Sequence, residues 1–242
     1  MNFKILKMND LHIPYQDDKA FNVALEFAKN FRPNILVLDE ILDFYSISKF
    51  VKDPNRETTL NDEIVLARSY LAKIRKALPN TKIVMVESNH DVRLKKYLWS
   101  EAPKISNFSC LAIENLLCLE ELKIEYLHQF VFRDIIFKHG EVVRPYSGVS
   151  ARWEYIKEGM SGISGHTHRL AMIFHTNRSG VYFWMESGCL CTLNPEYMPG
   201  IANWQQGISG IEFSKGFRAI HPFLIPITNG ELMWGGKIYG KG

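Results

Sequence analysis

The sequence predicts an α/β fold in a single domain. A strand, a helix and a second strand follow one another near its start, which is the order of a β-α-β unit. A long amphipathic helix comes next, and the second half consists mainly of strand-like segments. The 242 residues are enough to bury one core, and no repeat or linker divides them, so residues 1–242 are assigned to one domain.

The first β-α-β unit follows from the spacing of its apolar residues. Residues 3–8 alternate apolar side chains with lysines, which is typical of a strand. Asp17 or Asp18 can cap the helix that follows, and Pro33 ends it. Residues 35–38 are a continuous apolar run, as expected of a strand that is covered on both faces.

The next helix has the clearest signal in the chain. Thr59, with Asp62 three residues later, forms a capping-box pattern. From Leu60 to Leu78 the apolar residues recur at alternating spacings of four and three, which is the period of an amphipathic helix. A third strand is expected at residues 82–86.

The rest of the chain is expected to be rich in strands. One or two helices, broken at Pro103, are predicted between residues 92 and 118, and a short helix at 152–157. Residues 124–127 and 130–137 resemble neighbouring strands. Four further strands are predicted at residues 171–175, 181–185, 208–213 and 219–227.

Composition and charge exclude several classes of protein. The hydrophobic content of 46% and the charged content of 23% are ordinary for a globular domain, which excludes disordered and collagen-like chains. The net charge of +3 allows phosphorylated ligands without demonstrating them. Because no apolar run reaches membrane-spanning length and the start is too short and charged for a signal peptide, we expect a cytoplasmic protein without membrane contact. The oligomeric state does not follow from the sequence.

The four cysteines fit buried, reduced thiols better than a disulfide framework in a chain of this length. They are Cys110, Cys118, Cys189 and Cys191. No second pair with the spacing of a zinc site accompanies Cys189 and Cys191, so the sequence disfavours a structural zinc there.

Polar residues suited to metal binding follow several of the apolar runs. Gly165 opens a loop that carries His166 and His168, and neutral imidazole is the commonest side-chain ligand of transition metals. Acids, imidazoles and an amide occur in four other places, namely Asp10 with His12, Asp39 with Glu40 and Asp43, Asn89 with His90 and Asp91, and His139 before Gly140. Delivered from the ends of successive strands, these side chains predict a site for two metal ions.

In this order and with these neighbours, the five motifs resemble the calcineurin-like metallophosphoesterase superfamily. Its pattern is D-x-H, G-D-x-x-D, G-N-H-[DE], H and then G-H-x-H, and the match extends from Asp10 to His168. The stretch from His12 to Tyr15 and the region of Phe44 are similar to bacterial and phage members that resemble DNA-repair exonucleases. The resemblance implies a four-layer α-β-β-α sandwich.

The resemblance also implies two divalent transition-metal ions. One ion would be bound by Asp10, His12 and His168, the other by Asn89, His139 and His166, with Glu40 bridging them. Imidazoles with carboxylates suit Mn, Fe or Zn better than Ca or Mg, so Mn is expected, with Fe, Zn or Ni as alternatives.

The chain departs from the family pattern at the bridging position. It has Asp39 where the family has a glycine, and Glu40 in place of the aspartate. Glu40 can bridge the ions, or a shifted loop can offer Asp39 instead. Loss of one metal ion is the third alternative.

The function that the resemblance implies is a metallophosphoesterase, a metal-dependent phosphoester hydrolase. We predict a phosphodiesterase that acts on nucleotides or nucleic acid, in which two metal ions activate the attacking water. His90 would protonate the leaving oxygen or hold the phosphate, and Asp91 would orient an imidazole. Candidate phosphate contacts are Arg93, Arg144 and Arg169. The alternatives are a phosphomonoesterase, including a phosphoprotein phosphatase, with the same site, and a non-catalytic binding protein with a degraded metal centre.

Overall fold

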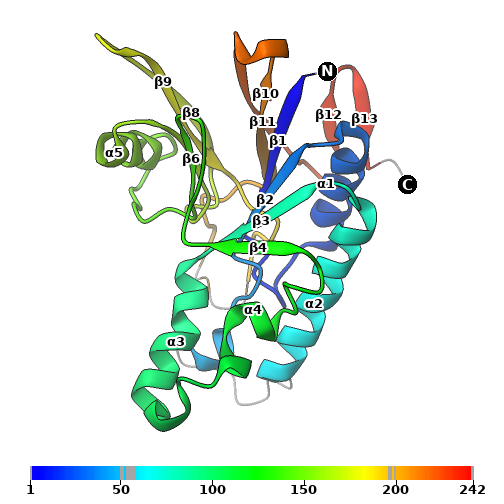
Figure 1. Ribbon diagram of the computed structural model, residues 1–242, viewed down its shortest axis with the longest axis vertical. Coiled ribbons are helices and arrows are strands. Elements are labelled where there is room, and N and C mark those ends of the chain that lie inside the picture. The colour runs from blue at the N-terminus through cyan, green and yellow to red at the C-terminus, as the bar shows by residue number, and fades with distance from the viewer. Residues whose placement is uncertain (1, 50–51, 53–57, 196–197, 199, 241–242) are drawn as a thin grey trace.

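The chain forms two β-sheets that pack face to face. The computed structural model describes residues 2–49, 52, 58–195, 198 and 200–240 (Figure 1). The first sheet is parallel from β1 to β4 and gains two antiparallel strands at one edge. In sheet order its six strands are β11 (Ile220–Pro226), β10 (Gly207–Phe213), β1 (Phe3–Asn9), β2 (Ile35–Asp39), β3 (Lys82–Val86) and β4 (Ile124–Leu127).

The second sheet is built from the second half of the chain. Its three central strands are parallel and each edge strand is antiparallel to its neighbour. In sheet order its five strands are β5 (Phe130–Phe132), β6 (Ile135–Phe137), β7 (Ser161–Ser164), β9 (Gly180–Ser187) and β8 (Leu170–Asn177). A small hairpin near the end of the described chain consists of β12 (Leu232–Trp234) and β13 (Lys237–Tyr239).

Five α-helices are assigned in the described chain, and four short 3₁₀ turns accompany them. The α-helices are α1 (Asp18–Phe31), α2 (Leu60–Ala77), α3 (Asn89–Glu101), α4 (Ile113–Leu116) and α5 (Val149–Glu158). The 3₁₀ turns are η1 (Tyr45–Ile47), η2 (Pro103–Ile105), η3 (Ser109–Leu111) and η4 (Lys215–Phe217). None of the described helices is both long and apolar enough to cross a membrane.

The helices begin where polar side chains satisfy their free backbone N–H groups. The Asp17 side chain accepts a hydrogen bond from the Ala20 N–H at 2.9 Å, so Asp17 and not Asp18 caps α1. Thr59 and Asp62 form the predicted capping box of α2. A second capping box, between Ser88 and Asp91, begins α3.

Three separate apolar cores show that the architecture is a four-layer α-β-β-α sandwich, as expected. The largest lies between the first sheet and its helices and includes Phe27, Leu71 and Leu38. The second lies between the two sheets. The third joins α5 to the outer face of the second sheet through Ala151 and Trp184. In Figure 1, α1 and α2 accordingly lie on one side of the paired sheets and α5 on the other.

The structure differs from the sequence-based expectation in three segments. Residues 130–137 form two strands with a tight turn between them, because Phe132 pairs with Ile135. The segment from 92 to 118 contains α3, η2, η3 and the one-turn α4. Two of the cysteines expected to be buried are accessible, since Cys110 is exposed and Cys118 is half-buried.

A matched pair of substitutions in α2 tests how this helix packs. Leu71 is fully buried, whereas 53% of Val65 is exposed on the same helix. We expect Leu71→Ala to lower the free energy of unfolding by about 2 to 5 kcal/mol, because it leaves a cavity in the largest core. Val65→Ala should change it by less than about 0.5 kcal/mol. Urea denaturation of both variants measures the difference, and equal losses would contradict the described orientation of α2.

Candidate metal centre

Polar side chains from both sheets meet where their parallel strands end. Because Asn9 is paired with Asp39 in the register of β1 and β2, the next residues, Asp10 and Glu40, lie side by side. Asn89 begins α3 after β3. From the second sheet come the histidines that follow β6 and β7, namely His139, His166 and His168.

A first cluster consists of Asp10, His12, Glu40 and His168. The Nε2 atom of His12 lies 2.9 Å from Nε2 of His168 and 3.0 Å from Oε2 of Glu40. Oδ1 of Asp10 lies 3.9 Å from the same His12 nitrogen and 3.6 Å from Nε2 of His168. All four residues are buried, and their ligand atoms are close enough together to hold one metal ion.

A second cluster consists of Glu40, Asn89, His139 and His166. The Nε2 atom of His139 lies 2.6 Å from Oδ1 of Asn89, 3.0 Å from Nδ1 of His166 and 3.5 Å from Oε2 of Glu40. Unlike the first cluster it reaches the surface, because Asn89 is exposed. A cavity of about 220 Å³ borders it and is lined by Asn89, His139 and Lys138, among others.

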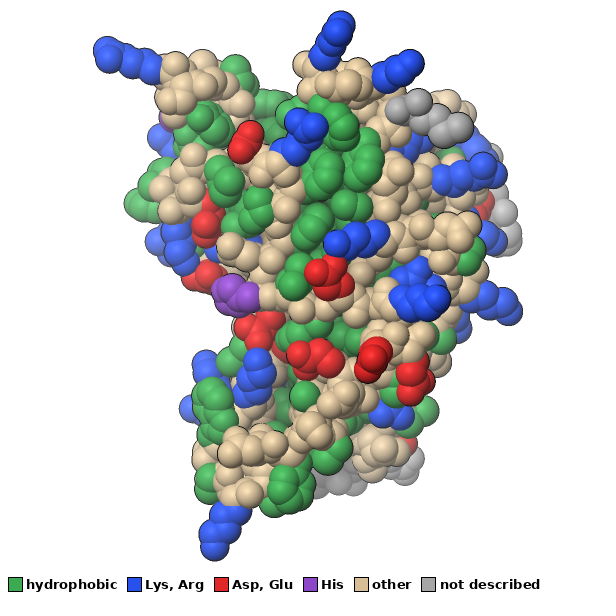
Figure 2. All heavy atoms as spheres, viewed as in Figure 1, with side chains coloured by type: hydrophobic (Ala, Val, Ile, Leu, Met, Phe, Trp, Pro, Cys, Tyr) green, Lys and Arg blue, Asp and Glu red, His purple; other side chains and the backbone are tan. Residues whose placement is uncertain are grey.

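One face of the molecule carries a band of acidic side chains. Figure 2 shows acidic side chains gathered across the middle of the face, next to a notch in the outline where a histidine reaches the surface.

Glu40 is the carboxylate common to both clusters. Its Oε2 atom lies between His12 and His139, which belong to different clusters. Asp39 instead forms an ion pair with Lys7, and both of these side chains are fully buried. Asp39 approaches His139 only on the other side of the ring, at 3.7 Å from Nδ1. The second carboxylate thus has a cationic partner of its own.

The nitrogen and oxygen atoms of the two clusters are better placed to bind cations than to hydrogen-bond to one another. Two imidazole nitrogens facing each other across 2.9 Å can share only one proton, and a neutral pair leaves lone pairs directed at the same point. Among the described residues, the buried Oε1 of Glu40, Nδ1 of His90 and Nδ1 of His139 have no hydrogen-bond partner. Imidazole, carboxylate and amide ligands together suit divalent transition metals.

Burial and neighbouring charges shift the pKa values of Glu40 and Asp10 in opposite directions. Burial acts to raise the pKa of Glu40, but nearby histidines, His139 first, outweigh it and hold this pKa well below its ordinary value. Burial, with the charges of Asp39 and Glu40, raises the pKa of Asp10 well above its ordinary value. Ionisation of Asp10 is therefore unfavourable without a cation.

The backbone is strained at the same positions. Most of the candidate ligands on loops have a positive φ, which is disfavoured for residues other than glycine. The φ values are 54° at Asp10, 50° at His12, 44° at Glu40, 66° at His166 and 56° at His168. Such conformations persist only where the surroundings fix them, and they are commonest at functional sites.

Asp43 and Arg93 border the first cluster and contact two histidines, His12 and His90. Oδ2 of Asp43 lies 2.8 Å from Nδ1 of His12, which leaves Nε2 of His12 free to face the cluster. Arg93 donates to the Asp43 carbonyl oxygen at 2.8 Å and to Nε2 of His90 at 2.7 Å. The Arg93 guanidinium, predicted to contact phosphate, is thus hydrogen-bonded to the protein.

The two predicted catalytic residues stand in different environments. Burial lowers the pKa of His90 to about 4, so this imidazole does not have the ordinary pKa that the sequence-based assignment assumed. The Asp91 carboxylate accepts hydrogen bonds from the backbone N–H of Ser88 and, at 3.3 Å, from the Tyr126 hydroxyl. Asp91 therefore fixes the start of α3. None of the hydrogen bonds described for its carboxylate comes from an imidazole, and its role in orienting one stays a prediction.

The other two predicted arginines lie on the loops around the centre. Arg169 donates hydrogen bonds to the backbone oxygens of Arg144 and Asn203, the latter at 3.3 Å. The Arg144 guanidinium lies 5.4 Å from the ring of Trp153 and is exposed. Neither joins the two clusters.

Two neighbours of the centre, Lys7 and Cys191, were not predicted from the sequence. Lys7 is buried inside the sandwich. The sequence indicated this only by the spacing of two residues between Lys7 and Ile5, which places both on one face of the strand. Trp204 packs its ring 4.2 Å from that of His168. Cys191 approaches the same histidine, with Sγ 3.9 Å from Nδ1. The last two contacts join residues distant in sequence and leave no local pattern.

Comparison with known proteins gave structural neighbours only. No family model matches the sequence, and no curated protein matches it. Similar solved structures include a Vps29 single mutant from Entamoeba histolytica, with 12% identity, a TM-score of 0.49 and coverage of 96% of each chain. Vps29 from Chaetomium thermophilum has 13% identity and a TM-score of 0.48, covering 94% of this chain and 92% of that chain. The same protein in complex with a cyclic peptide has 10% identity and a TM-score of 0.47, covering 94% and 89%.

Separating Lys7 from Asp39 tests the ion pair between the sheets. We expect Lys7→Met and Asp39→Leu each to lower the free energy of unfolding by about 3 to 5 kcal/mol, because each leaves one buried charge without its partner. The double variant should be more stable than either single variant, since the apolar pair leaves no buried charge. Guanidinium denaturation of the three variants gives these values.

The control is the exposed ion pair between Lys82 and Glu125 in the same sheet, whose atoms are 2.7 Å apart. Lys82→Met should cost less than about 1 kcal/mol. A Lys7→Met variant as stable as this control would contradict the buried pair.

Proposed function

We propose that this chain is a metal-dependent phosphoester hydrolase that acts on phosphodiesters of nucleotides or nucleic acid. The supporting observation is the position of Glu40 between two clusters of imidazole, acid and amide ligands. Asp10, His12 and His168 would hold one divalent ion, and the second cluster the other, with Mn²⁺ as the expected metal. Such ions, when bound, lower the pKa of water and neutralise the charge that develops on a phosphate.

Residues around the clusters orient the metal-binding side chains. A neutral imidazole carries one proton, and the His12 proton is directed to Asp43 from Nδ1, which leaves the Nε2 lone pair to a cation. The buried pair of Lys7 and Asp39 keeps the additional acid away from the shared position of Glu40.

His90 is the proposed substrate-contacting residue. Arg93 donates to its Nε2, so the proton of the neutral ring lies on Nδ1. This Nδ1 lies 3.6 Å from Oε1 of Glu40 and is therefore directed toward the site. From there it can donate a hydrogen bond to an oxygen of the bound phosphoester.

Two residues around the centre, Trp204 and Arg144, support the preference for nucleotide phosphodiesters. The Trp204 ring beside His168 offers a face for stacking against a base. The guanidinium of Arg144 can pair with a phosphate in bidentate geometry. A phosphomonoesterase would use the same ligands, and a binding protein with a degraded centre would bind at most one ion without turnover.

Hydrolysis by metal-stripped protein resupplied with single metals tests the proposal. A chromogenic phosphodiester and its monoester counterpart would be assayed with Mn²⁺, Zn²⁺, Ni²⁺ or Mg²⁺, with metal content counted in the same samples. We expect turnover of the diester with two ions bound. Turnover of the monoester alone would favour the phosphatase, and one ion or none without turnover of either substrate would favour the binding protein.

Substituting His90 separates substrate contact from metal binding. His90→Ala should lower kcat by about 10² to 10³, the usual effect of removing one hydrogen-bond donor to the reacting group, while the metal content stays the same. His221→Ala is the control, because His221 is exposed on β11. Unchanged turnover in His90→Ala would remove His90 from the mechanism.

A further inference from the structure

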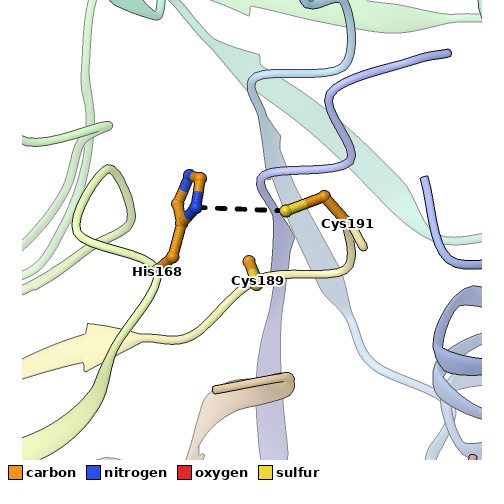
Figure 3. Close-up of side chains that lie close together, drawn as sticks. All are labelled: His168, Cys189 and Cys191. Carbon is orange, nitrogen blue, oxygen red and sulfur yellow. Dashed lines mark hydrogen bonds between the residues drawn. The ribbon is translucent and has the colours of Figure 1, made fainter. Parts of the chain in front are cut away.

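Two buried thiols face the side of His168 that the clusters do not use. Cys189 and Cys191 follow β9, and Figure 3 shows both beside the His168 ring. The two sulfur atoms and a ring nitrogen of His168 all lie within 4.8 Å of one another. The exposed fractions are 0% for Cys189, 2% for Cys191 and 4% for His168.

The two nitrogens of His168 face chemically different ligands. Nε2 faces His12 and Asp10 in the first cluster. Nδ1 faces the sulfur of Cys191 at 3.9 Å. One side of the ring thus meets oxygen and nitrogen ligands, and the other meets sulfur.

The spacing on the sulfur side is close to that of a metal site. In tetrahedral zinc sites, bonds of about 2.3 Å to sulfur and 2.0 Å to nitrogen place these two atoms about 3.5 Å apart. The observed 3.9 Å needs only a small side-chain movement to match. Thiolate ligands with imidazole select zinc and other soft cations over Mn²⁺ or Mg²⁺.

The backbone holds the two thiols in place. The N–H of Cys189 donates to the Gln205 carbonyl at 3.1 Å, and the Cys189 carbonyl accepts from the Gly207 N–H at 3.1 Å. The N–H of Leu190, between the cysteines, donates to the Asp10 carbonyl at 3.1 Å. A segment fixed in this way loses little freedom when it binds an ion.

We propose that Cys189, Cys191 and Nδ1 of His168 form a binding site for a thiophilic cation such as Zn²⁺, which adjoins the first cluster and shares the His168 ring with it. The sequence disfavoured zinc here because the cysteine pair has no partner pair. The third ligand comes instead from a loop that precedes β8. The site does not depend on whether the neighbouring clusters are catalytic.

Cd²⁺ tests the site, because its bonds to thiolates absorb in the ultraviolet. The Cys110→Ser/Cys118→Ser variant retains only the two proposed ligand thiols. Under reducing conditions and without other metals, we expect it to develop the charge-transfer absorption of two thiolate bonds, with the intensity of one thiolate-bound Cd²⁺ per chain. The matched Cys189→Ser/Cys191→Ser variant also retains two cysteines and should lack the absorption.

His168→Gln tests the third ligand in the same assay. It should keep the absorption but bind Cd²⁺ at least about tenfold more weakly. Unchanged affinity in His168→Gln, no absorption in Cys110→Ser/Cys118→Ser, or equal absorption in the two double variants would each overturn the proposal. If circular dichroism shows that Cys189→Ser/Cys191→Ser is unfolded, the single variant Cys191→Ser replaces it and should halve the absorption, whereas full absorption would overturn the site.

Discussion

The centre depends on compensating the negative charges of three carboxylates that are buried side by side. Asp10, Asp39 and Glu40 are almost inaccessible to solvent, and an uncompensated buried charge is costly. The charge of each carboxylate is compensated by a different group. Lys7 pairs with Asp39, histidines surround Glu40, and Asp10 faces imidazole nitrogens whose arrangement suits a cation. The backbone at Asp10 and Glu40 has a positive φ where these groups meet.

The strained loops are held by one another more than by their own sequence. The N–H groups of Leu11 and His12 both donate to the Glu40 carbonyl, at 3.0 and 3.2 Å, which fixes the loop after β1 on the loop after β2. A Cβ atom at Gly165 would collide with the Asp10 carboxylate and lie 2.9 Å from Nδ2 of Asn9. Only glycine therefore allows the histidine loop of the second sheet to approach the acids of the first.

Sequence patterns within single segments predicted much of the fold, but they did not predict contacts between segments that are distant in the sequence. The capping box at Thr59, the α2 helix and the β-α-β unit follow from spacing within one segment, and the structure confirms them. The split of residues 130–137 depends on a turn that apolar content does not reveal. The capping role of Asp91 was hidden because the same residue also fits a ligand motif. The contact of Cys191 with His168 exists only after the sheets have packed.

The two residues at which the chain departs from the resembled pattern, Asp39 and Glu40, are accompanied by a third, Lys7, which pairs with Asp39. Asp39 replaces a small residue at a position that faces the inside of the sandwich, and Lys7 on the neighbouring strand supplies the opposite charge. Removing Asp39 alone would leave the Lys7 ammonium buried without a partner, which costs more than the pair itself. Loss of activity in such a variant would reflect instability as well as chemistry. Any variant that restores the family residues at positions 39 and 40 must therefore also replace Lys7 by an apolar residue.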